Sequence, residues 1–271
     1  MKKLLYFALI LVLIAGVTVF GAWAPVAQAA VTEMRYADAP MVASIASEQI
    51  YYTSKEMTLV DTDGGAPTFV TTGNLTNSCG AVAGAEIVAF YDKYYPNLIP
   101  GWDSYYASSG KYRIQNDTYI APVMNELYTL MKTNVNGSGT SENEFKVGLQ
   151  QYFNNRNYSL SYQNIKSGSS MDFNAVKAAV DANKVMVLFI TPGEVYDISE
   201  WTDHDNYDAY TITGNHIMIA YGYLEIKYYN ASGLFRTERL VEVATGHPIT
   251  STGFYRINSS NLQAAYVVNV G

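Results

Sequence analysis

The amino-acid sequence predicts an α+β domain with two lobes, a helical N-terminal lobe and an antiparallel β-sheet C-terminal lobe. Two observations indicate this fold. Helix-like patterns fill residues 79–184, and strand-like runs fill residues 185–271. Helices and strands that are segregated along a chain are typical of α+β domains.

Residues 1–29 have the pattern of a secretory signal peptide. Lys2 and Lys3 precede a long apolar run, and the sequence AQA at 27–29 places small residues where a signal peptidase reads them. We therefore expect a secreted or extracellular protein, which includes association with the cell surface. An uncleaved leader is the alternative, because the apolar run is close to the shortest that spans a bilayer.

Composition and charge exclude some partners. The net charge is −7, and it becomes −9 when Lys2 and Lys3 leave with the leader. An acidic chain repels phosphate backbones, so nucleic acid is not an expected partner. The sequence implies no cofactor and no metal, and we expect a monomer that meets a membrane only through an uncleaved leader.

The region that follows the leader divides into two parts. Residues 30–70 are polar and irregular, with one short strand expected at 57–62, and we interpret them as an N-terminal extension packed on the domain. Residues 71–271 form the expected domain, which is long enough for one well-packed core.

Four helices are expected in the first half of the domain. The first runs from Cys79 to about Tyr94, follows a cap at Asn77 or Ser78, and is apolar on nearly every face, which is typical of a buried central helix. The others are expected at 119–134, at 141–156, where Ser141 and Glu144 form a capping box, and at 171–184.

Five strands are expected in the second half of the domain. They are the short apolar or alternating runs at 185–190, 215–229, 236–245, 253–258 and 264–270.

Cys79 is the only cysteine in the sequence, so it has no internal disulfide partner. A leftover cysteine in a secreted protein indicates intermolecular pairing or a reactive thiol, and the alternative is a small buried apolar residue. Its expected place in the first turn of a helix favours reactivity, because the helix dipole and free N–H groups stabilise a thiolate.

His216 is the best candidate for the base that a reactive thiol needs. It opens an apolar strand after a Gly-Asn turn, and flanking β-structure fixes such side chains well. His204 lies in an expected solvated acidic loop, and His247 lies beside a proline in an expected turn. The alternative for His216 is a core histidine bonded to a backbone carbonyl.

The ordered motifs NSCGAVAGAEIVAFYD and GNHIMIAYGY resemble the C39-like branch of the papain-like cysteine peptidases. The resemblance covers roughly residues 74–271. It implies a papain-like two-lobed fold, a Cys79 nucleophile, a His216 base and a peptide or protein substrate.

The resemblance also implies two supporting groups at positions where this sequence departs from the family. An amide that binds the oxyanion is usually a Gln six residues before the cysteine; Gly73 stands there, so Asn74 is the candidate and Asn77 the second. An Asn or Asp that orients the imidazole is replaced by Thr245, with Asn258 as the alternative.

The sequence therefore predicts an exported cysteine peptidase. Two alternatives stay open. One is a catalytically impaired papain-like module that binds a peptide or a cell-surface polymer. The other is a related acyl chemistry, such as that of a transglutaminase or a cell-wall amidase.

Overall fold

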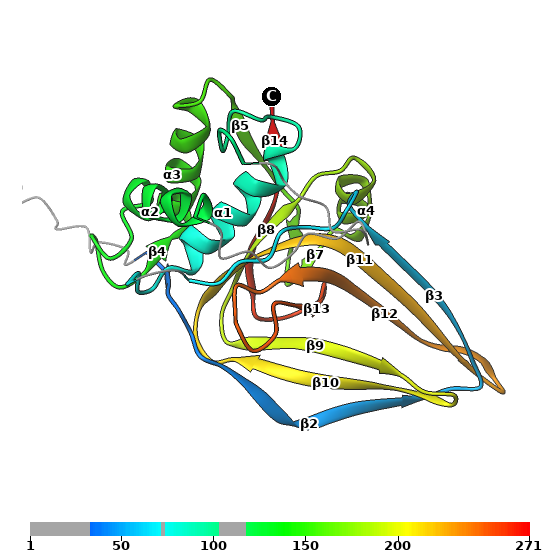
Figure 1. The fold of residues 1–271 in the computed structure, drawn as a ribbon. Helices are drawn as coiled ribbons and strands as arrows, with labels where there is room; N and C mark the ends of the chain where they lie inside the picture. Colours follow the sequence, from blue (N-terminus) through cyan, green and yellow to red (C-terminus); the bar gives the residue numbers. More distant parts are fainter. Residues whose placement is uncertain (1–32, 72–73, 103–117) are drawn as a thin grey trace, which may run out of the picture. The chain divides into compact units, whose positions relative to one another are not determined.

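One large antiparallel sheet of ten strands carries the fold. The computed structural model describes residues 33–71, 74–102 and 118–271, and the expected leader at 1–29 lies outside the described residues. The strand order is β2-β10-β9-β13-β12-β11-β8-β14-β5, and β3 pairs with the second half of β11 (Figure 1).

The bounds of the elements are as follows. The strands of the large sheet are β2 (Met41–Tyr51), β3 (Ser54–Asp61), β5 (Leu160–Asn164), β8 (Met186–Ile190), β9 (Gly193–Glu200), β10 (His204–Ile212), β11 (His216–Asn230), β12 (Gly233–Ala244), β13 (Thr252–Arg256) and β14 (Leu262–Val270). Two small sheets pair β1 (Arg35–Tyr36) with β4 (Thr140–Ser141) and β6 (Lys166–Ser167) with β7 (Ser170–Met171). The described helices are α1 (Cys79–Asp92), α2 (Ile120–Leu130), α3 (Glu142–Asn154) and α4 (Phe173–Asp181).

Helix α1 is the central helix that the sequence predicts, and all of its residues are buried. It packs in one apolar cluster with α2, α3 and one face of β8, β11 and β14. Small residues on α1 permit the close approach of this helix to α2. A Cβ atom built on Gly84 would lie 2.8 Å from the terminal methyl of Met131, so a larger residue there would displace the end of that side chain.

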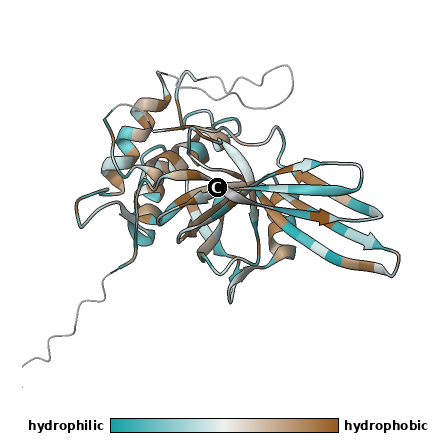
Figure 2. Ribbon diagram, turned by 90° about the horizontal axis from the view of Figure 1, so that it is seen from below, coloured by the Kyte–Doolittle hydropathy of each residue, from teal (hydrophilic) through white to brown (hydrophobic). Residues whose placement is uncertain are grey.

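The sheet is covered on both faces near β8. Val187 and Phe189 face the cluster around α1, whereas Met186 and Leu188 belong to the cluster that contains α4. Because successive strand residues point to opposite faces, a strand buried on both sides must be apolar throughout. Farther along the long strands, Figure 2 shows hydrophilic and hydrophobic residues in alternation.

The expected helix starts are confirmed for α3 and α4. Ser141 and Glu144 form a reciprocal capping box at the start of α3. At the start of α4, the side chain of Asp172 accepts hydrogen bonds from the backbone N–H groups of Asn174 and Ala175. These caps satisfy donors that have no partner inside the helix.

The predicted papain-like fold, with a helical N-terminal lobe and a separate β-sheet C-terminal lobe, is wrong. Strands β2 and β3 precede all described helices, yet β2 pairs with β10 and β3 pairs with β11. The sheet is therefore assembled from both ends of the described chain, and α1 lies directly against it. Residues 30–70, interpreted as an extension, supply two of its strands.

Among the strands of the large sheet, the sequence did not predict β2, β5, β9 and β10. The acidic segment around His204 was expected to be a solvated loop, but it begins β10, and Asp205 is fully buried. The Asp205 carboxylate accepts hydrogen bonds from Lys55 and from the hydroxyl of Tyr228. These partners come from β3 and β11, so only tertiary pairing makes the burial of this charge tolerable.

The buried carboxyl group of Glu86, in the middle of α1, makes folding stability depend on pH. Burial raises its pKa to about 8, while a hydrogen bond from the Phe69 N–H opposes this shift. The unfolded chain ionises this group near pH 4.5. The folded state therefore binds the extra proton, and stability is lost as the pH rises from about 4.5 through 8.

We expect the substitution Glu86→Gln to remove most of this pH dependence, because the amide cannot ionise. Each unit of pKa shift corresponds to about 1.4 kcal/mol, so the wild-type free energy of unfolding falls by a few kcal/mol between pH 5 and pH 8. Urea denaturation followed by tryptophan fluorescence measures this. Glu56→Gln, at an exposed carboxylate, is the matched control and keeps the wild-type slope. An unchanged slope in Glu86→Gln contradicts the assignment.

Candidate active site

Helix α1 begins at the buried residue Cys79 without a side-chain cap. Ser78 occupies the cap position, but its side chain makes no capping hydrogen bond. Its hydroxyl instead lies 2.7 Å from the Thr71 hydroxyl and 3.3 Å from a carboxylate oxygen of Asp38. The first N–H groups of α1 are therefore not occupied by the cap side chain.

The Cys79 thiol is neutral in the free protein. Only 3 % of the residue is exposed, and burial raises the pKa of the thiol to about 12, with a further contribution from the Asp38 carboxylate. The pKa of the thiol is lowered by hydrogen bonds from the backbone N–H groups of Ile217, Gly80 and Cys79 itself. Burial outweighs them, so the expected low-pKa thiol does not exist in this state.

The imidazole of His216 is fixed by one hydrogen bond. Nε2 lies 2.7 Å from the carbonyl oxygen of Thr245. A carbonyl oxygen can only accept, so Nε2 carries the proton and Nδ1 has the lone pair. Within the described part of the chain, Nδ1 is buried and has no hydrogen-bond partner. Burial lowers the pKa of His216 to about 3, with a further contribution from His247, and the ring is neutral.

Cys79 and His216 line the same cavity, which has a volume of about 540 Å³. The thiol is at the start of α1 and the imidazole is at the start of β11, two elements that pack together in one cluster. The cavity walls are mainly apolar, with Pro40, Val70, Val82, Ala39 and Pro248 among them. A mainly apolar wall with a few polar groups is usual for ligand sites.

Two residues of this cavity were not identified from the sequence. His247 follows β12, and its ring centroid lies 4.6 Å from that of His216. Burial lowers the pKa of His247, and Asp38 opposes this shift. Asp38 also lines the cavity, from the segment between β1 and β2. His247 lies beside a proline and was expected in a turn, so only the tertiary structure showed that both residues line this cavity.

The predicted supporting residues occupy different places. Asn74 is exposed and does not belong to the described lining of this cavity. The Asn77 amide donates hydrogen bonds of 3.0 Å to Asn134 and to Ser138, which tie the segment before α1 to the segment between α2 and β4. Asn258 lines a different cavity.

Thr245 contacts His216, but through its backbone rather than its side chain. Its hydroxyl donates to the carbonyl oxygen of Thr250 and accepts from the N–H of His247, 3.1 Å away. The carbonyl oxygen of Thr245 therefore does the orienting that the sequence assigned to a side chain. Any residue type could present this carbonyl, so the contact does not depend on the side chain at position 245.

No three His, Cys, Asp or Glu side chains of the described residues come together in an arrangement that could hold a metal ion. None of the helices in the described ranges is both long enough and apolar enough to cross a lipid bilayer. Comparisons of the chain with protein-family models, with curated proteins and with solved structures find no match. The resemblance to C39-like peptidases therefore stays a prediction that rests on the sequence motifs.

We expect iodoacetamide to alkylate Cys79 at least a hundredfold more slowly than glutathione at pH 8. A thiol with a pKa of about 12 has little thiolate at this pH, whereas an ordinary thiol has a pKa near 8.5. We expect Asp38→Asn to speed alkylation by about threefold to tenfold, because it removes a negative charge that raises the thiol pKa. Mass spectrometry of quenched samples measures both rates.

Asp197→Asn, at an exposed position of β9, is the matched control and leaves the alkylation rate unchanged. Alkylation of the wild-type protein at the rate of glutathione would show that the thiol is ionised or exposed in solution. An equal effect of both substitutions would remove the role given to Asp38.

Proposed function

We propose that this chain is an exported hydrolase that cleaves peptide bonds with the thiol of Cys79 as nucleophile and His216 as base. One observation supports the proposal above the others. A cysteine at an uncapped helix start and a histidine with an unpartnered Nδ1 line the same cavity. Peptides or proteins are the proposed substrates. Secretion depends on the leader at 1–29, which lies outside the described residues.

The neutral state of both groups requires proton transfer during attack. As Sγ forms a bond to the substrate carbonyl carbon, the thiol proton moves to Nδ1 of His216. The tetrahedral intermediate then collapses, the C–N bond breaks, and the imidazolium gives its proton to the leaving amine. Water, deprotonated by His216, hydrolyses the thioester and restores the thiol. The Thr245 carbonyl holds the ring in position throughout.

The oxyanion of the intermediate would bind to backbone donors. The N–H groups of Cys79 and Gly80 lie at the start of α1, where no cap side chain binds them and where they are near the Cys79 sulfur. They act with the positive end of the helix dipole. Asn74 is exposed outside the described cavity wall, so the proposal gives it no part in the mechanism.

A second candidate function is a binding module that holds a peptide or a cell-surface polymer without cleaving it. The raised pKa of Cys79 and the lowered pKa of His216 favour this candidate, since the thiol is protonated and the imidazole is a weak base before a ligand arrives. The two functions share the cavity and differ in turnover.

Profiling with a peptide library distinguishes the two functions. We expect the wild-type protein to cleave library peptides, with products identified by mass spectrometry. Cys79→Ala and His216→Ala should each lower the cleavage rate by at least about a hundredfold, because each removes a group of the acyl-transfer step. Products joined to added amines rather than to water would indicate acyl transfer instead of hydrolysis.

His204→Ala is the matched control, because His204 is a histidine outside the cavity, stacked between Tyr51 and Trp201. We expect it to retain wild-type cleavage. If the wild-type protein binds peptides but releases no products, the binding module replaces the hydrolase. Cleavage that survives Cys79→Ala would contradict the proposed nucleophile.

A further inference from the structure

A second cavity, with a volume of about 800 Å³, lies beside α4. Its walls come from the start of α4, from β12 and from the end of β13 with the residues that follow it. It shares no lining residue with the cavity of Cys79. A neighbouring hollow of about 430 Å³ shares Arg256 and Asn258 with it and extends the polar surface.

Four side chains near one end of this cavity form a closed ion-pair ring. Arg236 and Arg256 each donate to Glu48 and to Glu238. Glu48 is on β2 and the other three residues are on β12 and β13, so the ion-pair ring connects an edge strand with strands that do not pair with it. Its two positive and two negative charges balance, and we assign it a structural role.

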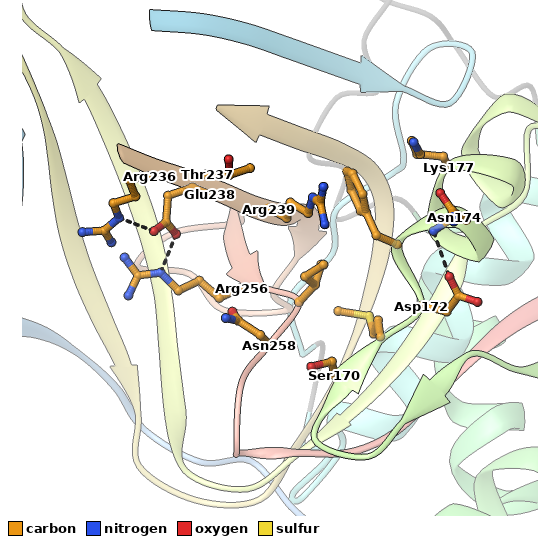
Figure 3. A pocket seen from close by; sticks show the side chains of 13 residues that line it. Ser170, Asp172, Asn174, Lys177, Arg236, Thr237, Glu238, Arg239, Arg256 and Asn258 are labelled. Carbon is orange, nitrogen blue, oxygen red and sulfur yellow. Dashed lines mark hydrogen bonds and ion pairs between the residues drawn. The ribbon is translucent and has the colours of Figure 1, made fainter. Parts of the chain in front are cut away.

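Two further cations lie outside the ion-pair ring. Figure 3 shows Arg239 between the ion-pair ring and Lys177, which projects from α4. The charged ends of both side chains are close to the Phe173 ring, 5.0 Å from its centroid for Arg239 and 5.1 Å for Lys177. Contacts of this kind hold a cation at a fixed place.

These two cations retain donors for a ligand. Arg239 forms an ion pair with Glu225 through Nε, 2.8 Å away, while its terminal amino groups have no acceptor among the described residues. Lys177, unlike Arg239, has no ion-pair partner among the described residues. One oxygen of the nearby Asp172 carboxylate accepts hydrogen bonds from the N–H groups at the start of α4.

The remaining polar lining is made of amides and hydroxyls. Ser170, Asn174, Thr237 and Asn258 border the cavity, and buried Met171 and Ile257 contribute apolar surface. Side chains of this kind exchange hydrogen bonds with ligand hydroxyl groups. The volume falls in the range of about 300–1,000 Å³ that is usual for small-molecule sites.

We propose that this cavity binds a small hydroxylated oxyanion, a carboxylate or a phosphate ester, anchored by Arg239 and Lys177. The planar guanidinium of Arg239 presents a fork of donors that matches either anion, and the ammonium of Lys177 adds a compact charge. The amides and hydroxyls bind the ligand hydroxyl groups. The proposal does not depend on the chemistry at Cys79.

Titration calorimetry of the full chain tests the proposal with three probes. They are trigalacturonate as carboxylate, glycerol phosphate as phosphate ester, and neutral maltotriose. We expect at least one anionic probe to bind with a dissociation constant below about 1 mM at low salt, and maltotriose not to bind. The anion that binds identifies the class of ligand. Raising the ionic strength should weaken binding, because the two cations are partly exposed.

The variants Lys177→Gln and Arg239→Gln should each weaken binding of that probe at least about tenfold, since each removes a charge-assisted hydrogen bond. Lys227→Gln, at a lysine outside the cavity, is the matched control and leaves affinity unchanged. Circular dichroism verifies that each variant is folded; Lys177→Gln decides the outcome if Arg239→Gln does not fold. The proposal is overturned if neither anion binds, if maltotriose binds equally well, or if a folded Lys177→Gln keeps wild-type affinity.

Discussion

The burial of α1 between α2, α3 and the central sheet is the constraint on which the rest of the structure depends. It sets the position of Cys79, because the helix begins at that residue. It also sets the position of His216, because the first half of β11 is the part of the sheet that packs against α1. Glycines at the helix surface make this packing possible, since a Cβ atom at Gly80 would lie 3.3 Å from the Thr140 hydroxyl.

The same burial determines the electrostatics of the candidate site. Loss of water disfavours every charged form, so the thiol of Cys79 and the imidazole of His216 are both neutral. Glu86, two turns along the same helix, responds in the same way and retains its proton to higher pH. A preformed ion pair between thiolate and imidazolium is therefore incompatible with this environment. Chemistry at the site requires that the proton moves when the substrate arrives.

The two faces of the sheet serve different purposes. The face toward α1 contains the cavity with a thiol, an imidazole and apolar walls. The α4 side has a larger and more polar cavity, which is lined by residues of the ion-pair ring, by Lys177 and by Arg239, whose Nε is paired with Glu225. Charged side chains are tolerated in the second cavity because solvent and paired carboxylates offset their desolvation.

The sequence by itself determined the local elements and the candidate residues. A run that is apolar on all sides specified the buried helix that starts at Cys79, and the capping box at Ser141 specified the start of α3. Only tertiary structure decided that β2 and β3 join the same sheet as β10 and β11, because the strands with which β2 and β3 pair are far away in sequence. The tertiary structure also brought Asp38 and His247 to the cavity of Cys79. There the partner of His216 is the backbone carbonyl of Thr245, whereas the sequence predicted a side chain. Local sequence patterns indicate which residues are buried, but the pairing of strands across the sheet decides which buried residues contact one another.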